Sequence, residues 1–280
     1  MITKNPMQLK AIIKNKAKEK NISAQLVMQN YMLERLLERI SISEYKSNFI
    51  LKGGFLISAI VGLDTRATMD LDTTIKGFTL THENIREIFD DICSIKIDDD
   101  VIFEIVSVND IREKDDYPGI RVSLKANYEP ISVPLTVDVT TGDIITPKEI
   151  EYTFSLMFDE RSINIISYNL ETILAEKIET VLSRAEANTR PRDFYDIYIL
   201  WNLHKENCDI ELLKLALKNT AKKRESTNVI LKYESILSSI ENSTQLQFFW
   251  NKYKKEFDYA KEIEFSNICK TILEIMRSLI

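Results

Sequence analysis

Two short stretches, a glycine pair and a pair of aspartates, constrain the fold of this chain more than any other feature. The first is Leu51-Lys52-Gly53-Gly54 and the second is Arg66-Ala67-Thr68-Met69-Asp70-Leu71-Asp72. In a β-strand the side chains at i and i+2 project to the same side, so Asp70 and Asp72 are expected to point together while Leu71 turns toward a core. Two carboxylates placed in this way can hold one divalent cation or bridge two.

The glycine pair is suited to binding phosphate. Gly53 and Gly54 lack a Cβ, which lets a phosphate come close to main-chain N–H groups. The apolar run from Phe55 to Ile60 predicts a helix whose N-terminus favours an anion. A glycine pair, a short helix and an Asp-x-Asp strand are similar to the arrangement in nucleotidyltransferases of the polymerase-β type. The alternative is an ordinary glycine turn followed by a chance Asp-Leu-Asp.

The composition is that of an ordinary globular protein. Of the 280 residues, 44% are hydrophobic and 29% are charged, which allows one large domain or two smaller ones. The formal net charge of -6 argues against a protein that coats nucleic acid non-specifically, because such binding depends on a broad basic surface. Basic clusters at residues 14–20 and 222–224 leave a local basic patch open, although such clusters are more often solvated helix faces.

The sequence predicts a cytoplasmic protein that does not associate with membranes. No apolar run reaches the roughly 18 residues that span a bilayer. The first residues lack the apolar stretch of a signal peptide. Cys93, Cys208 and Cys269 are odd in number and far apart, so neither a disulfide framework nor a zinc site is expected.

Hydrophobic periodicity divides the chain into a mixed first part and a helical second part. Helices are expected over Ser23–Ile40 and after Thr81, which can cap a helix, and again from Asn169 onward. Stretches rich in β-branched and aromatic residues predict strands that join the Asp70 strand in one sheet: Val101–Val108, Gly119–Tyr128, Pro134–Thr140, Tyr152–Phe158 and Ile163–Ile166. The expected fold is α+β, with a mixed-sheet domain over residues 1–166 and a helical domain over residues 167–280.

A third carboxylate lies on the polar face of a predicted strand. Between Leu135 and Thr140 the apolar residues share one face, which places Asp138 on the other. If this strand neighbours the one that carries Asp70 and Asp72, three carboxylates converge, as two-metal phosphoryl-transfer sites require. The alternative is a surface aspartate on an edge strand.

A lysine lies on the apolar stripe of the helix that begins near Asn169. Lys177 is at i+3 from Leu174 and i-4 from Val181, so it faces inward. Burying an ammonium without a partner costs several kcal/mol, so Lys177 should meet a carboxylate or, in a cleft, a phosphate. The alternative is snorkelling, in which the stem packs and the amine returns to water.

The next helix supplies a candidate partner for this lysine. Pro191 and Asp193 mark a helix start, and Asp193 and Asp196 share a face at i, i+3. Asp196 lies beside apolar positions, so Lys177 and Asp196 are expected to pair or both to reach a nucleotide cleft. Asp193 is expected to act as a helix-start charge or to pair with an arginine.

With these residues in view, the chain resembles the AbiEii/AbiGii toxin family, the nucleotidyltransferase-like toxins of bacterial abortive-infection and toxin-antitoxin systems. The resemblance rests on four stretches in the same order, namely Leu51–Gly54, Arg66–Asp72, Glu171–Lys177 and Arg192–Asp196. It implies a polymerase-β-type nucleotidyltransferase domain followed by helices. The helices after Trp201 are covered by general expectation alone.

The resemblance implies a role for each matching residue. Asp70 and Asp72 would bind the Mg²⁺ or Mn²⁺ that carries a nucleoside triphosphate, Lys177 would contact its phosphates, and Asp196 would be a further essential carboxylate. Asp138, if it joins the pair, would be a third metal ligand and the natural general base. The implied nucleotide-binding residues are Gly53, Gly54, Arg66, Thr68 and Lys177.

The implied reaction is nucleotidyl transfer, in which a hydroxyl attacks the α-phosphate of the triphosphate and pyrophosphate leaves. By analogy the acceptor is RNA, in particular the 3′ end of tRNA, so that modification would block translation and support phage defence. The implied partner is an AbiEi-like winged-helix antitoxin encoded nearby. Two alternatives stay open: modification of a protein hydroxyl by nucleotidylation or phosphorylation, and a non-catalytic nucleotide-binding interaction protein.

Overall fold

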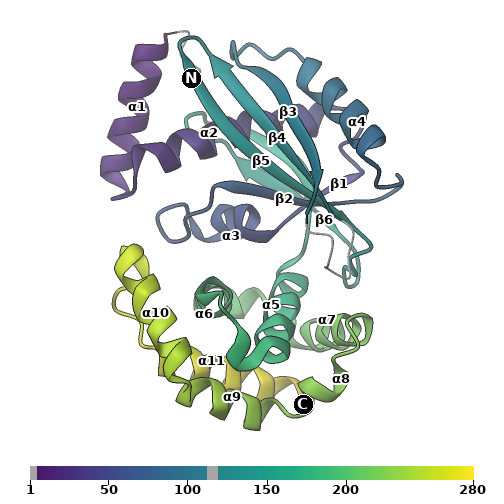
Figure 1. Cartoon of the computed structure of the whole chain (residues 1–280), viewed down its shortest axis with the longest axis vertical. Helices are drawn as coiled ribbons and strands as arrows, with labels where there is room; N and C mark the ends of the chain where they lie inside the picture. Colours follow the sequence, from purple (N-terminus) through teal and green to yellow (C-terminus); the bar gives the residue numbers. More distant parts are fainter. Residues whose placement is uncertain (1–4, 112–118) are drawn as a thin grey trace. The chain divides into compact units, whose positions relative to one another are not determined.

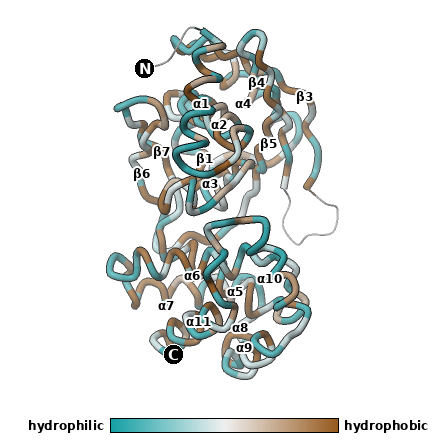
Figure 2. The backbone as a smooth tube through the Cα atoms, turned by 90° about the vertical axis from the view of Figure 1, so that its left-hand side faces the viewer, coloured by the Kyte–Doolittle hydropathy of each residue, from teal (hydrophilic) through white to brown (hydrophobic). Residues whose placement is uncertain are grey.

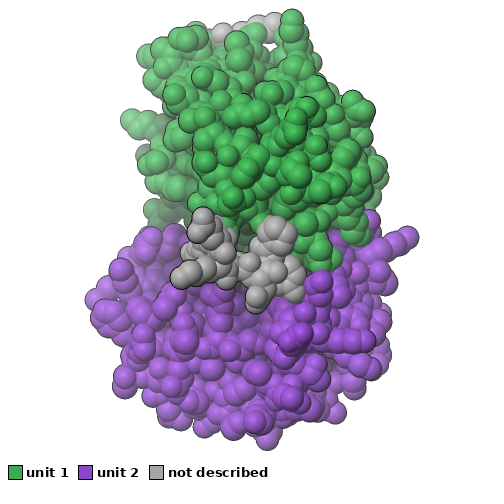
Figure 3. Space-filling model, turned by 45° about the vertical axis from the view of Figure 1, so that its right-hand side comes forward, with its two compact units in different colours: residues 1–143, 150–167 green, residues 144–149, 168–280 purple. Residues whose placement is uncertain are grey.

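The computed structural model describes residues 5–111 and 119–280 and divides them into two compact units (Figure 3). The first unit contains the described residues up to Asp143 together with Ile150–Ser167. The second contains Ile144–Glu149 and Tyr168–Ile280. The short segment Ile144–Glu149 belongs with the helices because Thr146 accepts a hydrogen bond from Asn169 and donates its main-chain N–H to Thr172.

A mixed sheet forms the centre of the first unit (Figure 1). Among the described residues it has seven strands in the order β3-β4-β5-β2-β1-β7-β6. The β2/β5 and β1/β7 pairs are parallel and the others are antiparallel. The strands are β1 (Phe49–Lys52), β2 (Asp70–Ile75), β3 (Ile102–Asp110), β4 (Gly119–Tyr128), β5 (Ile131–Thr141), β6 (Ile150–Ser155) and β7 (Ser162–Ser167).

Helices of the first unit begin where the sequence places capping residues. Ser23 caps α2 (Ala24–Ile42) and Thr81 caps α4 (His82–Ser94), each by accepting a main-chain N–H of the first turn. These two helices contact each other, and α2 contacts β5 and β7 while α4 contacts β3. The other helices of the unit are α1 (Pro6–Glu19), which contacts α2, and α3 (Gly53–Val61), which contacts β1 and β2.

The predicted strands are all present: β4 has the predicted ends, Gly119 and Tyr128, and the others differ by a few residues. Strand β5 begins at Ile131, before the predicted Pro134. Proline is tolerated there because β5 pairs with β2 only from Thr136 onward, so the missing N–H of Pro134 removes no bond to that neighbour. Strand β6 ends at Ser155, three residues before the predicted end, at the turn that leads into β7. The α+β fold class is confirmed.

Helix α2 carries more than the apolar packing face that its sequence predicts. Glu34, Arg35 and Glu38 are almost fully buried, and Arg35 donates to both carboxylates at 2.6 and 2.7 Å. Glu38 also accepts from Arg161 at 2.8 Å, and Glu34 accepts the main-chain N–H of Met157 at 2.7 Å. Burial raises the pKa of Glu34 to about 7, against the opposing charge of Arg35. These contacts fix the β6–β7 turn to α2.

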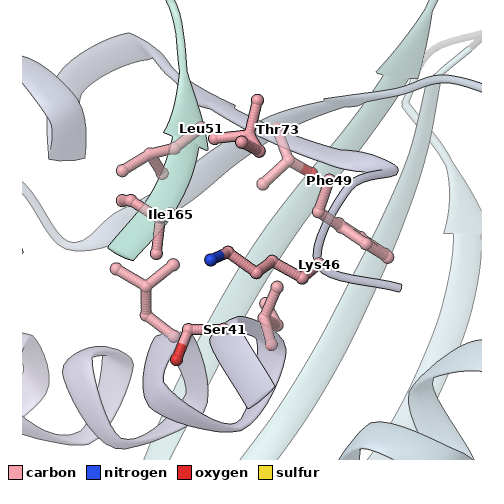
Figure 4. A pocket seen from close by; sticks show the side chains of 9 residues that line it. Ser41, Lys46, Phe49, Leu51, Thr73 and Ile165 are labelled. Carbon is pink, nitrogen blue, oxygen red and sulfur yellow. The ribbon is translucent and has the colours of Figure 1, made fainter. Parts of the chain in front are cut away.

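A small pocket lies between α2 and the sheet (Figure 4). It is lined mainly by apolar side chains, including Leu37, Phe49 and Leu51, and by Lys46 and Thr73. Thr73 follows Asp72 in β2, so its side chain projects to the opposite side of the sheet from the aspartate. This pocket is therefore separate from the acidic face of the sheet.

The second unit is a bundle of helices with hydrophobic and hydrophilic residues alternating along the chain (Figure 2). Its α-helices are α5 (Leu170–Arg184), α6 (Pro191–His204), α7 (Ile210–Lys223), α8 (Thr227–Ile230), α9 (Tyr233–Asn242), α10 (Thr244–Glu256) and α11 (Phe265–Leu279). Helix α11 contacts α6, α7 and α9 and buries one whole face, which includes Ile268, Ile272 and Ile275. Across residues 5–111 and 119–280, no helix combines the length and the apolar character needed to cross a bilayer.

Candidate active site

The glycine pair and Asp72 form one structural element of the first unit. Strand β1 ends at Lys52, and α3 begins at Gly53 with a φ of +66°. A Cβ on Gly53 would lie 2.1 Å from Oδ2 of Asp72, so a side chain at this position would overlap the carboxylate. The main-chain N–H of Gly54 donates to the same oxygen at 3.2 Å. Glycine is thus required both by the backbone conformation and by the closeness of Asp72.

The three predicted carboxylates are carried by neighbouring strands. Strand β2 runs parallel to β5, with Asp72 opposite Asp138 and Asp70 opposite Thr136. Residues that pair directly across two strands project to the same face, and Leu71 between the aspartates is fully buried as expected. The strand that carries Asp138 is therefore the neighbour of the strand that carries Asp70 and Asp72, which is the arrangement required for the three carboxylates to converge.

Negative charges outweigh positive charges around Asp72. Burial raises the pKa of Asp72, and the nearby charges of Asp138 and Asp70 raise it further. The Gly54 N–H and the Lys52 ammonium act in the opposite direction, and the pKa of Asp72 remains above its usual value. A divalent cation at this position would relieve the repulsion between the carboxylates.

Thr68 and Arg66 lie against the glycine pair. A Cβ on Gly54 would lie 2.9 Å from Oγ1 of Thr68 and 3.2 Å from Nη2 of Arg66, and both side chains are buried. The segment before Asp70 is held by α2, because Asn30 donates to the carbonyl of Thr68 at 2.7 Å. The predicted nucleotide-binding residues of the first unit therefore gather around one turn.

The second unit contains a separate cluster of one lysine and two aspartates. Nζ of Lys177 on α5 lies 2.7 Å from Asp193 and 3.0 Å from Asp196, both on α6. Asp196 is fully buried, and the side chain of Lys177 is 21% exposed. The predicted carboxylate partner of Lys177 is confirmed. The predicted arginine partner of Asp193 is wrong: one lysine lies between both aspartates because i and i+3 face the same neighbouring helix.

Comparison with known proteins identifies the family of this chain. A sequence model described as nucleotidyl transferase AbiEii toxin, type IV toxin-antitoxin system, matches residues 35–270. The chain belongs to this AbiEii family. The match spans the glycine turn, the Asp70 strand and the Lys177 cluster.

Two solved structures from Helicobacter pylori share the fold of this AbiEii chain. One, described as a nucleotidyltransferase candidate, has 14% sequence identity and a TM-score of 0.51, and the alignment covers 92% of this chain and 97% of that one. The other, JHP933, has 15% identity and a TM-score of 0.50, with coverages of 92% and 94%. Comparison with curated proteins gave no match. The AbiEii chain is thus a nucleotidyltransferase by family, and the solved structures support its fold.

Two charged residues near the acidic cluster of the AbiEii chain escaped the sequence analysis. Lys52 lies opposite Asp72 in the sheet, and its ammonium donates to Thr140 at 2.7 Å and pairs with Asp143. Burial acts to raise the pKa of Asp143, but Lys52 outweighs it and holds that pKa below its usual value. The sequence could have indicated this position, because Lys52 directly precedes the glycine pair.

Arg121 is the second missed residue. Its Nε and Nη2 donate to the two carboxylate oxygens of Asp138, each at 2.8 Å. Strands β4 and β5 are joined by the two residues Glu129 and Pro130, and the resulting register places Arg121 opposite Asp138. The turn could have revealed this pair, since a hairpin's register follows from its loop length.

The residues of the acidic cluster fit a hard divalent cation. Their donors are all carboxylate oxygens, the ligands that Mg²⁺ and Mn²⁺ prefer. Asp70 is exposed, and Asp72 has the raised pKa of a crowded carboxylate. Across the described ranges, no three acidic, histidine or cysteine side chains are already placed to hold a metal ion. Asp70 and Asp72 fit such an ion, and Asp138 can join them when its oxygens are released from Arg121.

Proposed function

We propose that this AbiEii-family protein is a toxin that transfers a nucleotide from a nucleoside triphosphate to an RNA acceptor, the 3′ end of tRNA, and so blocks translation. Family membership supports the nucleotidyltransferase activity and the toxin role. The observation that carries the site assignment is the register of Asp72 and Asp138 beside the turn at Gly53. Carboxylates and main-chain N–H groups meet there as a metal-bound triphosphate needs.

Each residue of the first unit has a part in this proposal. Asp70 and Asp72 hold Mg²⁺ or Mn²⁺, and Asp138 completes the set and accepts the proton of the attacking hydroxyl. The divalent ion supplies positive charge that stabilises the pentacovalent phosphorus and the leaving pyrophosphate. The absence of side chains at Gly53 and Gly54 lets a phosphate approach the main chain of this turn, where the Gly54 N–H donates to Asp72, and the buried Arg66 and Thr68 lie beside it.

The helical unit contributes Lys177 and Asp196 to the proposed activity. Lys177 supplies positive charge for the triphosphate, and Asp196 fixes the orientation of the lysine through the 3.0 Å ion pair. Asp193 shares the same ammonium at 2.7 Å and has the same orienting part. The lysine is thus held in one rotamer before the substrate arrives, which reduces the entropy lost on binding.

We further propose that the protein acts in the cytoplasm, where triphosphates and tRNA are available. Its partner is a cognate antitoxin, an AbiEi-like winged-helix regulator encoded nearby. This pairing follows from the toxin-antitoxin family alone.

Incubation of the full chain with each α-³²P-labelled triphosphate, total tRNA and Mg²⁺ tests the reaction. Label on tRNA supports the proposal, and label on protein would instead support modification of a protein hydroxyl. Asp70→Asn and Asp72→Asn should lower the transfer rate at least about a hundredfold, the scale of losing one preorganised electrostatic group. Glu151→Gln, an exposed carboxylate on β6, serves as the matched control and should retain full activity. Unlabelled tRNA and unlabelled protein with all four α-labelled triphosphates would refute nucleotidyl transfer, and the same incubation with γ-³²P-labelled triphosphates tests phosphorylation of a protein hydroxyl.

A further inference from the structure

Arg121 brings a fixed positive charge to the proposed metal site. A transverse row of the sheet runs through Asp72 on β2, Asp138 on β5 and Arg121 on β4, because each residue pairs directly with the next. Direct cross-strand partners project to one face, so the guanidinium and the two carboxylates share that face. Lys52 on β1 pairs with Asp72 and extends the row, so the charge order along it is plus, minus, minus, plus.

The guanidinium uses both oxygens that a metal would need from Asp138. Nε and Nη2 donate to Oδ1 and Oδ2 at 2.8 Å, the bidentate geometry that makes arginine–carboxylate pairs strong and directional. A divalent ion that takes Asp138 as a ligand must share these oxygens with the guanidinium or displace it, and it brings a second positive charge against Arg121. Two cations therefore compete for one carboxylate.

The surroundings of Arg121 allow such an exchange. Its side chain is 48% exposed, whereas that of Asp138 is 17% exposed, so the arginine can swing into water while the aspartate stays in place. The hydrogen bonds to Asp138 raise the pKa of Arg121, and the charges of Asp138, Asp70 and Asp72 add to this effect. The arginine thus responds to the whole acidic cluster, the charge of which a bound metal would neutralise.

We propose that Arg121 is a displaceable counter-ion of the acidic cluster: it neutralises Asp138 in the metal-free protein, gives way to the divalent ion, and thereby sets the affinity for the metal. The inference rests on the proposed function in one respect, namely that Asp138 is a metal ligand. Arg121 acts here through Asp138, as a positioning residue. Its effect is on metal affinity and does not require turnover.

The test measures Mn²⁺ binding to the full chain by the electron paramagnetic resonance signal of free Mn²⁺, without nucleotide or RNA. Arg121→Gln should bind Mn²⁺ at least about fivefold more tightly than the wild type, the range expected from losing one bidentate competitor. Arg121→Lys keeps the positive charge but cannot form the bidentate contact with Asp138. Its Mn²⁺ affinity should therefore lie between those of the wild type and of Arg121→Gln. Lys125→Gln is the matched control, since Lys125 lies four residues along β4 and pairs with Pro134, and it should change the affinity by less than about twofold.

An Asp138→Asn background separates competition from a general charge effect. There the Arg121→Gln change should leave Mn²⁺ affinity unaltered, because the contested ligand is gone. Equal tightening in both backgrounds, or no tightening in the wild-type background, would overturn the proposal, provided that circular dichroism shows each variant folded. The result is independent of the transfer assay: competition for Mn²⁺ can be present in a protein that modifies no tRNA, and absent in one that does.

Discussion

The two charged clusters of this protein differ in the ratio of carboxylates to cations and in the elements that carry them. In the sheet unit, Asp70, Asp72 and Asp138 come from adjacent parallel strands and face one bonded guanidinium, that of Arg121. In the helical unit, Asp193 and Asp196 come from one helix and share the ammonium of Lys177. Arg121 and the neighbouring Lys52 act on three carboxylates in the first case, and one lysine contacts two carboxylates in the second.

This difference separates a cluster open to a further cation from one that is complete in itself. In the sheet cluster the pKa of Asp72 is raised and Asp70 is exposed. Binding of a divalent ion would therefore reduce the repulsion between the carboxylates of this cluster. The helical cluster is more deeply buried, and its lysine contacts both carboxylates, so removing the lysine takes a positive charge away from two buried acids. The sheet cluster is therefore expected to govern catalysis, and the helical cluster to govern stability as well as activity.

The largest expected effect comes from breaking the helical cluster at its cation. Lys177→Met keeps the volume of the stem but removes the ammonium that contacts both buried carboxylates, Asp193 and Asp196, which should lower the free energy of unfolding by about 3 kcal/mol. Urea denaturation followed by circular dichroism measures this loss. Lys214→Met, an exposed lysine on α7, is the control and should stay within about 0.5 kcal/mol of the wild type. Equal stability of the two variants would remove the distinction between the clusters.

The same two clusters show how far sequence reasoning reached. Alternation of polarity predicted the faces of Asp72 and Asp138, and helical spacing predicted the inward lysine, because both follow from the local period of the backbone. What the local period cannot give is the choice of partner between segments distant in sequence. Asp193 was expected to be a helix-start charge or to pair with an arginine. It lies in the first turn of α6, but its partner is Lys177, and Arg121 was overlooked beside Asp138.

Buried charge within α2 was missed for a related reason. Glu34, Arg35 and Glu38 look like the solvent side of an amphipathic helix, yet the β6–β7 turn covers them. A helix that is buried on most of its circumference can carry charged residues only where another segment brings a partner. The sequence between Met157 and Arg161 gives no periodic signal of that kind.

A smaller effect should come from filling the glycine turn of the sheet cluster. Gly53→Ala places a Cβ 2.1 Å from the present position of Asp72 Oδ2 and forces alanine to a φ of +66°, so the carboxylate must move. We expect a stability loss of about 1–2 kcal/mol together with loss of most transfer activity.

The matched control for this change is Gly142→Ala. Gly142 also has a positive φ, +82°, but a Cβ there would have no neighbour within 4 Å. Gly142→Ala should lower the free energy of unfolding by about 1 kcal/mol through backbone strain and should retain the transfer rate. If both variants lost activity equally, the loss would come from backbone strain in this unit, and the closeness of Gly53 to Asp72 would have no catalytic meaning.

The smallest expected effect concerns Glu34, a buried carboxylate that is paired with Arg35. It tests whether this ion pair alone keeps the buried acid charged. The pKa of Glu34 is raised by burial from 4.5 to about 7 although Arg35 lies 2.6 Å away. The folded state therefore binds the proton more tightly than the unfolded state, so Glu34 adds stability as the pH falls through about 7 toward 4.5. Between about pH 8 and pH 6 the gain should be on the order of 1 kcal/mol. Urea denaturation of the wild type and of Glu34→Gln across this range measures it: the stability of the wild type relative to the variant should rise as the pH falls. A difference that stays constant from pH 8 to pH 5 would mean that the Arg35 ion pair keeps Glu34 charged throughout, and that two arginines suffice for two buried glutamates.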